Sequence, residues 1–201
     1  MAKWIKNEYY KKLTYKNLLR AHMLARRGKN FRDEIIKFNL KQEEYILWLY
    51  EQLKNKTYKH GGYTVFYVTE PKLRKIERSR YIDRIVHTFY VENFLKPYFM
   101  SQFVSTSYAC IKNRGMHKCC LDIQQKMKHC KRIWGEYYIL KMDVKKFFQN
   151  IDKNILLKIL LKKIKDKDLI WLTKEIIYSN EGEKNLPIRK LYITNICQYI
   201  P

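Results

Sequence analysis

Residues 138–152 read YILKMDVKKFFQNID, and this stretch decides the expected fold. Along residues 138–144 the side chains alternate with a period of two, which predicts a β-strand with Asp143 near its end. Asp152 is then expected to cap a helix whose apolar positions recur at helical spacing: Leu156, Ile159, Leu160 and Ile164. The sequence therefore predicts a strand, a turn that carries a carboxylate, and a helix.

Further elements are expected on both sides of this stretch. Another helix is predicted over roughly residues 168–179, and one is expected to follow Gly115 and run to about His129. Upstream, residues 63–69 are rich in β-branched and aromatic residues, which predicts a strand that Pro71 stops. Ser79 is expected to cap a long helix that Pro97 ends and whose inner stripe is Ile82, Ile85, Val86 and Phe89.

Residues 1–61 are expected to be helical and strongly basic. One helix runs through Leu18, His22 and Ala25 and ends at Gly28, a residue suited to a left-handed helix end. Asn39 with Gln42 three residues later predicts a capping box for a second helix, with the apolar positions Ile46, Leu49, Tyr50 and Leu53. Because helices alternate with strands along the rest of the chain, we expect an α+β fold.

Charge and composition narrow the function. The 201 residues are 46% hydrophobic, enough to bury a core, and carry 42 Lys and Arg against 19 Asp and Glu, a net charge of +23. This excess is spread over the whole chain, which indicates a folded body with a polyanionic partner. No long uncharged apolar run or signal peptide is evident, so we expect a cytoplasmic protein with no membrane partner and with reduced cysteines.

Asp143 is the first candidate for chemistry. A carboxylate where a strand meets a turn can hold Mg²⁺, which prefers oxygen ligands and leaves positions for phosphate and water. The alternative is an aspartate that only caps the turn.

The segment from Asp143 to Phe148, followed by Asn150-Ile151-Asp152, resembles motif A of bacterial reverse transcriptases, the group of retrons, group II intron proteins and diversity-generating retroelements. Three further blocks resemble the fingers of these enzymes in order and spacing: residues 71–76, residues 81–87, and Ser107-Tyr108-Ala109-Cys110 with residues 114–118. The resemblance covers about residues 62–188, and within it the last block is most similar to the diversity-generating branch.

The resemblance implies a role for each matching residue. Asp143 and the main-chain carbonyl of Val144 would hold Mg²⁺, and Phe148 would exclude the ribonucleotide 2′-hydroxyl, although its neighbour Phe147 is the alternative gate. Lys72 and Arg74 would bind the triphosphate, unless they are ordinary solvated cations. Arg84 would support its helix or contact template phosphate. The remaining nucleic-acid contacts are expected from Arg114 and Lys118.

The implied function is RNA-directed DNA synthesis with an RNA template, a DNA or RNA primer, deoxynucleoside triphosphates and Mg²⁺. The expected architecture is part of a right-hand polymerase: a basic helical region (1–61), fingers (62–138), a partial palm (139–188) and an out-of-frame tail (189–201). The 201 residues contain no Tyr-x-Asp-Asp motif, which predicts that this chain alone is inactive.

The tail carries a specific hypothesis. The family's motif B continues Leu-Pro-Ile with Gly-Asn-x-Thr-Ser-Gln, whereas Ile188 is followed here by Arg189 and Lys190. One permitted set of codons for residues 189–200, read one base later, encodes Gly-Asn-Tyr-Thr-Ser-Gln. A one-base frameshift near codon 188 would therefore explain the tail.

Two other functions remain open at this stage. A non-catalytic RNA-binding protein would share the charge and the aromatic content, and a complementing subunit would obtain its missing palm from a second polypeptide. A zinc site is a lesser alternative, because its candidate ligands lack the usual paired spacing: Cys110, His117, Cys119, Cys120, His129 and Cys130.

Overall fold

The computed structural model describes residues 4–71, 73–109 and 111–184, and it is a mixed α+β structure. The chain divides into two compact units, of which one comprises residues 1–101 and 148–201 and the other residues 102–147. These boundaries differ from the expected polymerase regions, because the basic amino-terminal helices and the helices that follow Asp152 belong to one unit. No described helix is both long and apolar enough to cross a bilayer.

The first unit begins with the expected basic helices. They are α1 (Tyr9–Lys12), α2 (Tyr15–Arg26), α3 (Asp33–Leu40) and α4 (Gln42–Lys54). Gly28 follows α2 with a φ of 70°, as expected for a residue just beyond a helix end. The capping box at Asn39 is wrong: this residue lies inside α3, and Lys41 precedes α4 without a side-chain cap.

A two-stranded antiparallel hairpin follows, formed by β1 (Tyr63–Val68) and β2 (Arg74–Ser79). The first strand confirms the expectation for residues 63–69, but the sequence analysis missed β2. This strand has no alternation of apolar residues, because four of its six residues are charged: Arg74, Lys75, Glu77 and Arg78. It forms a strand because it pairs with β1.

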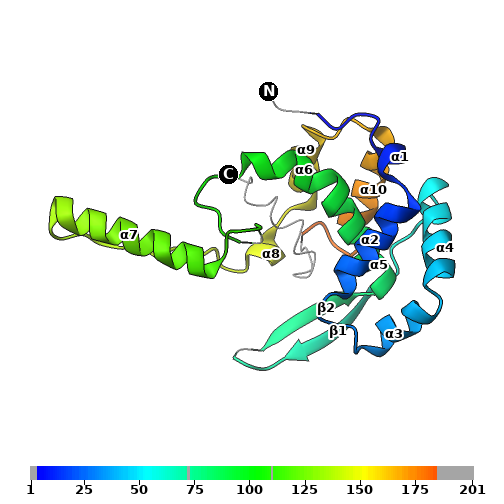
Figure 1. Ribbon diagram of the computed structural model, residues 1–201, viewed down its shortest axis with the longest axis horizontal. Coiled ribbons are helices and arrows are strands. Elements are labelled where there is room, and N and C mark those ends of the chain that lie inside the picture. Colours follow the sequence, from blue (N-terminus) through cyan, green and yellow to red (C-terminus); the bar gives the residue numbers. More distant parts are fainter. Residues whose placement is uncertain (1–3, 72, 110, 185–201) are drawn as a thin grey trace. The chain divides into compact units, whose positions relative to one another are not determined.

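Helix α5 (Tyr81–Tyr90) is the central helix of the first unit and packs against α2 (Figure 1). Of the expected stripe, Ile85, Val86 and Phe89 are fully buried, whereas Ile82 is partly exposed. Ser79 does not cap the helix, because it is the last residue of β2 and Arg80 occupies the capping position.

Pro97 does not end this helical run. A π-helical turn, η1 (Val91–Leu95), leads into α6 (Lys96–Phe99), and Pro97 lies in the first turn of α6. A proline in a helix removes a hydrogen bond and crowds the carbonyl four residues earlier. The wider π turn, together with a restart at α6, explains how the chain stays helical through Pro97.

The carboxyl-terminal part of the first unit contains α8 (Phe147–Asn150), α9 (Lys153–Leu161) and α10 (Lys167–Ile177). Asp152 caps α9 as expected, accepting hydrogen bonds from the N–H groups of Asn154 and Ile155 at 2.8 and 3.0 Å. Leu156, Leu160 and Ile164 are fully buried. Ile159, the fourth expected position, is partly exposed, so the expected apolar face is confirmed at the other three.

Two buried polar side chains, Asp166 and Lys153, form hydrogen bonds that stabilise this part of the first unit. Asp166 bonds to the amino-terminal segment, and Lys153 bonds to the loop after α10. Asp166 accepts hydrogen bonds from the N–H groups of Glu8 and Tyr9 at 2.8 and 2.9 Å, and it also caps α10. The ammonium of Lys153 is surrounded by main-chain carbonyls and donates to those of Asn180 and Gly182 at 2.6 Å. Burial lowers the pKa of Lys153.

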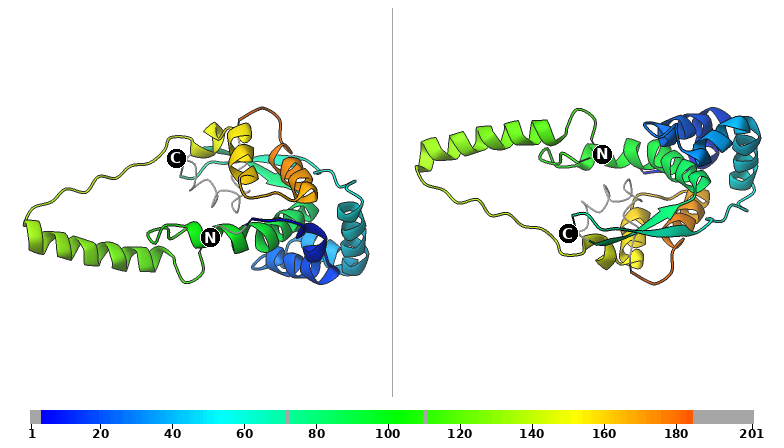
Figure 2. Two further views of the ribbon diagram at one scale, coloured as in Figure 1. Left: turned by 90° about the horizontal axis from the view of Figure 1, so that it is seen from above. Right: turned by 90° about the horizontal axis from the view of Figure 1, so that it is seen from below.

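A short 3₁₀ turn, η2 (Met100–Gln102), crosses the boundary between the two units. The second unit contains one long helix, α7 (Met116–Trp134). Helix α7 follows Gly115 as expected and extends five residues beyond His129. Figure 2 shows the chain leaving the end of α7 and diverging from the helix as an extended segment.

The expected strand over residues 138–144 is not formed. These residues are extended but belong to no sheet in the part of the chain that the structure describes, and Tyr138 and Met142 are 97% and 80% exposed. Alternation gives a segment the side-chain pattern of a strand, but a strand forms only when a neighbouring strand pairs with its N–H and C=O groups. No described segment supplies that neighbour.

Candidate nucleic-acid interface

The β1–β2 hairpin carries Arg74, one of the two residues expected to bind a triphosphate. Arg74 begins β2 and is exposed, while Lys72 lies outside the described residues. The register pairs Phe66 with Ile76 and Val68 with Arg74. Because alternate residues of a strand share a face, Arg74, Ile76 and Arg78 project from the same face as Phe66.

Asp83 anchors the base of this hairpin. It is buried in α5 and accepts a hydrogen bond of 2.6 Å from the Tyr58 hydroxyl, while the N–H of Gly61 lies 3.2 Å from each carboxylate oxygen. Burial raises the pKa of Tyr58, and the negative charge of Asp83 raises it further. The sequence analysis assigned Asp83 no role, although an acidic residue inside an apolar stripe is a signal for a buried carboxylate with partners.

Arg84, the next residue, supports the fold of the first unit. Its guanidinium forms an ion pair with Glu34 of α3 and lies over the Tyr81 ring, 5.1 Å from the ring centroid. Arg78 pairs with the other oxygen of Glu34 at 2.7 Å. These contacts fit the supporting role expected for Arg84, and both this role and a contact with template phosphate stay predictions.

The two arginines also set the charge of Glu34. Burial alone would raise the pKa of this carboxyl, but the hydrogen bonds from Arg84 and Arg78 outweigh burial and lower it. Glu34 is therefore ionised at neutral pH, and its charge is offset by two cations.

The segment that resembles motif A has residues in both units. Asp143 and Val144 are exposed residues of the extended segment in the second unit, whereas Phe148 lies in α8 of the first unit with Arg74 and Arg84. Because the expected nucleotide site draws on both units, the roles of Asp143, Val144 and Phe148 stay predictions.

Arg114 and Lys118 organise the loop before α7 and the start of this helix. The Arg114 guanidinium donates to the carbonyls of Val104 and Ser107 at 3.2 and 3.3 Å. The Lys118 ammonium lies 3.7 Å from one carboxylate oxygen of Asp122, and the other oxygen accepts a hydrogen bond of 2.7 Å from the Tyr108 hydroxyl. Both cations remain on the surface, and their contacts with nucleic acid stay predictions.

The donor set for a metal ion is small. The Asp143 carboxylate and the Val144 carbonyl are oxygen ligands of the kind that Mg²⁺ accepts, and their exposure leaves room for water and phosphate. No group of three His, Cys, Asp or Glu side chains lies together among the described residues. Cys119, Cys120 and Cys130 are free thiols, while Cys110 and Cys197 lie outside the described residues.

The chain was also compared with known proteins. No protein-family model matches it, and no curated protein sequence matches it significantly.

Proposed function

We propose that this chain contains the fingers and part of the palm of an RNA-directed DNA polymerase of the bacterial reverse transcriptase type. The observation that carries the proposal is the spacing of Asp143, Val144 and Phe148, preceded by three blocks in the order of the family. The α+β structure supports it, because an antiparallel hairpin with exposed Arg74 is followed directly by a buried helix. The right-hand arrangement of these parts belongs to the proposal.

Each proposed residue has a distinct task. The Asp143 carboxylate and the Val144 carbonyl hold Mg²⁺, which offsets phosphate charge and activates the primer 3′-hydroxyl when bound. The Phe148 ring excludes a 2′-hydroxyl by its bulk. Lys72 and Arg74 stabilise the triphosphate with fixed positive charge. Since two metal ions need further carboxylates, we expect residues 1–201 alone to bind nucleic acid without extending a primer.

The gene tests the family assignment directly. We expect the nucleotides downstream of codon 188, read in the shifted frame, to encode Gly-Asn-x-Thr-Ser-Gln and then Tyr-x-Asp-Asp. If this frame is open, the product that reads through it should extend a DNA primer on an RNA template, and Asp143→Asn should abolish extension while leaving RNA affinity unchanged. Absence of both motifs from every frame would refute the polymerase proposal.

A non-catalytic RNA-binding protein is the second candidate, and the charge of +23 favours it independently of motif A. RNA binding by this chain is measured by fluorescence anisotropy over a series of salt concentrations. We expect the logarithm of the binding constant to fall linearly with the logarithm of the salt concentration, by about 0.7 per phosphate contacted on a single strand. RNA binding without the shifted-frame motifs would select this second candidate, and no RNA binding at low salt would exclude both.

A further inference from the structure

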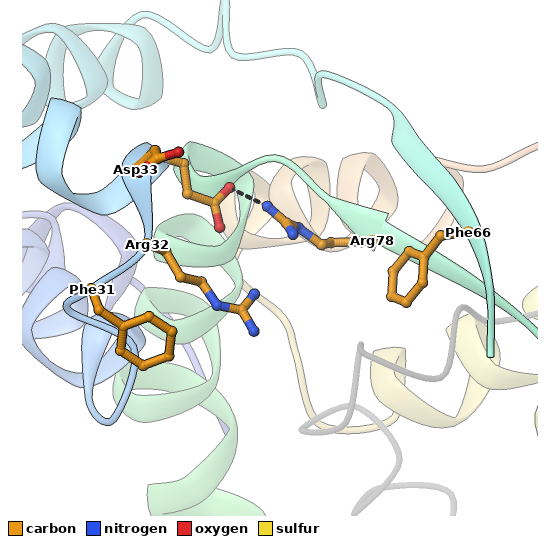
Figure 3. A pocket seen from close by; sticks show the side chains of 6 residues that line it. Phe31, Arg32, Asp33, Phe66 and Arg78 are labelled. Carbon is orange, nitrogen blue, oxygen red and sulfur yellow. Dashed lines mark ion pairs between the residues drawn. The ribbon is translucent and has the colours of Figure 1, made fainter. Parts of the chain in front are cut away.

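A pocket of about 600 Å³ lies in the first unit, between the turn before α3 and the β1–β2 hairpin (Figure 3). It is lined by Phe31, Arg32, Asp33, Glu34, Phe66 and Arg78. Its volume lies in the range of small-ligand sites, about 300 to 1,000 Å³. Two aromatic rings and two guanidinium groups around one opening are the groups that contact RNA bases and phosphates.

The two guanidinium groups of this pocket are not equivalent. Arg78 is held by Glu34 at 2.7 Å, and Glu34 is also paired with Arg84. Arg32 has no ion-pair or side-chain hydrogen-bond partner among the described residues, and in Figure 3 its guanidinium points into the opening. Arg32 is therefore the cation available to a bound anion. Arg78 lines the pocket, but its positive charge is offset by its ion pair with Glu34.

Phe31 is the second unusual feature. Its side chain is 77% exposed, so little of the ring is buried in the core. Phe66 lines the pocket from the hairpin, on the face that also carries Arg74 and Arg78. An exposed ring beside a cation without a partner offers one group for a base and one for its phosphate.

We propose that this pocket binds one unpaired nucleotide of a single-stranded RNA, with its base stacked on Phe31 and its phosphate paired with Arg32. The proposal rests on the proposed function only in taking RNA as the ligand, since it uses neither Asp143 nor the nucleotide site. Bases in a duplex are already stacked on their neighbours, so the pocket favours single strands. Arg74, on the same face of the hairpin, would contact the backbone of the same strand.

The test compares variants for binding to a fluorescent single-stranded RNA of 12 adenosines and to an RNA hairpin duplex. We expect Phe31→Ala to weaken single-strand binding about 5- to 100-fold and duplex binding less than about 2-fold, because one stacked base is lost. Phe31→Trp should restore the affinity, and its fluorescence should be quenched by the single strand. The matched control is Leu40→Ala, which removes an 81% exposed side chain at the other end of α3.

Arg32→Gln tests the phosphate contact separately. It should reduce the slope of the logarithm of affinity against the logarithm of salt concentration by about 0.7, the value for one phosphate on a single strand. Thermal melting of every variant checks folding, and Phe31→Trp keeps the test valid if the alanine variant is unstable.

Three results would overturn the pocket proposal. They are equal affinities for wild type and Phe31→Ala, equal losses for single strand and duplex, and a Phe31→Trp fluorescence that the single strand leaves unchanged. Failure of the proposed function gives a different result, because a chain that binds no RNA would leave wild type and all variants equally inactive in both assays.

Discussion

Residues 138–144 and α9 are near neighbours in the sequence and both carry regular apolar patterns, yet only α9 is ordered by the fold. Leu156 in α9 is fully buried, whereas Leu140 is 79% exposed. A helix satisfies its backbone hydrogen bonds within its own segment, so α9 needs only an apolar surface to cover one face. A strand needs a neighbour for every N–H and C=O, and residues 138–144 have none in the described chain. A local pattern therefore predicts helices more safely than strands.

Hydrogen exchange measured by mass spectrometry should show the largest difference between the two segments. We expect the amides of residues 138–144 to exchange within seconds, because no secondary structure protects them. Amides in α9 and α10 should exchange at least about 1,000-fold more slowly, since opening them requires unfolding of the core. Slow exchange in residues 138–144 would contradict the unpaired state and indicate a partner strand in solution, including one from a second copy.

A matched pair of substitutions tests the same contrast in free energy. Leu156→Ala should lower the free energy of unfolding by about 2 to 5 kcal/mol, because it leaves a cavity in the core. Leu140→Ala should change it by less than about 0.5 kcal/mol, since the side chain is already in water. Urea denaturation of both variants is the measurement, and equal losses would show that Leu140 is buried.

A substitution at Asp166 tests how much its hydrogen bonds between the amino-terminal segment and α10 contribute to stability. Its buried carboxylate accepts hydrogen bonds from residues on both sides, so Asp166→Ala should cost about 2 to 4 kcal/mol of the free energy of unfolding. Asp143→Ala is the matched control, because this exposed carboxylate should contribute almost nothing to stability. A small effect at Asp166 would mean that its N–H donors find water instead.

Features that depend on a few neighbouring residues were predictable from the sequence, whereas features that depend on another element were not. Gly28, Asp152 and the buried positions of α5 and α9 were predictable, because each depends on residues within a few positions along the chain. The expected caps at Asn39 and Ser79 were wrong, since the preceding element extends through each of these residues. Local sequence patterns do not show where a neighbouring element stops.

The candidate site was predictable only in part. Arg74 was expected on the fingers and lies exposed on β2, but the pairing of Arg84 with Glu34 joins residues 50 positions apart and leaves no mark in either local pattern. The pocket beside Phe31 was missed for the same reason, whereas Asp83 did leave a local signal, but its partners Tyr58 and Gly61 did not. Long-range polar contacts require the fold to be known before their partners can be named.

The smallest expected effect on the free energy of unfolding comes from protonation of His22, a buried residue of the first unit. It lies in α2, with its ring stacked on Phe38 at 4.9 Å, and burial and the nearby charge of Arg26 lower its pKa from 6.5 to about 4. A lowered pKa means that the folded state binds this proton less readily than the unfolded chain. Stability is therefore fully present above pH 6.5 and falls as the pH drops toward 4, by roughly 1 to 3 kcal/mol.

Urea denaturation between pH 7 and 4 measures this loss. His22→Gln, which removes the titrating ring, should flatten the pH dependence in this window while lowering stability at pH 7. The loss of charge on Glu34 at lower pH adds its own slope, and this slope should persist in the variant. An unchanged slope in His22→Gln would place the acid sensitivity in other groups. Because α7 buries no residue, its helical signal should not follow the His22 transition, which separates the two units by their response to acid.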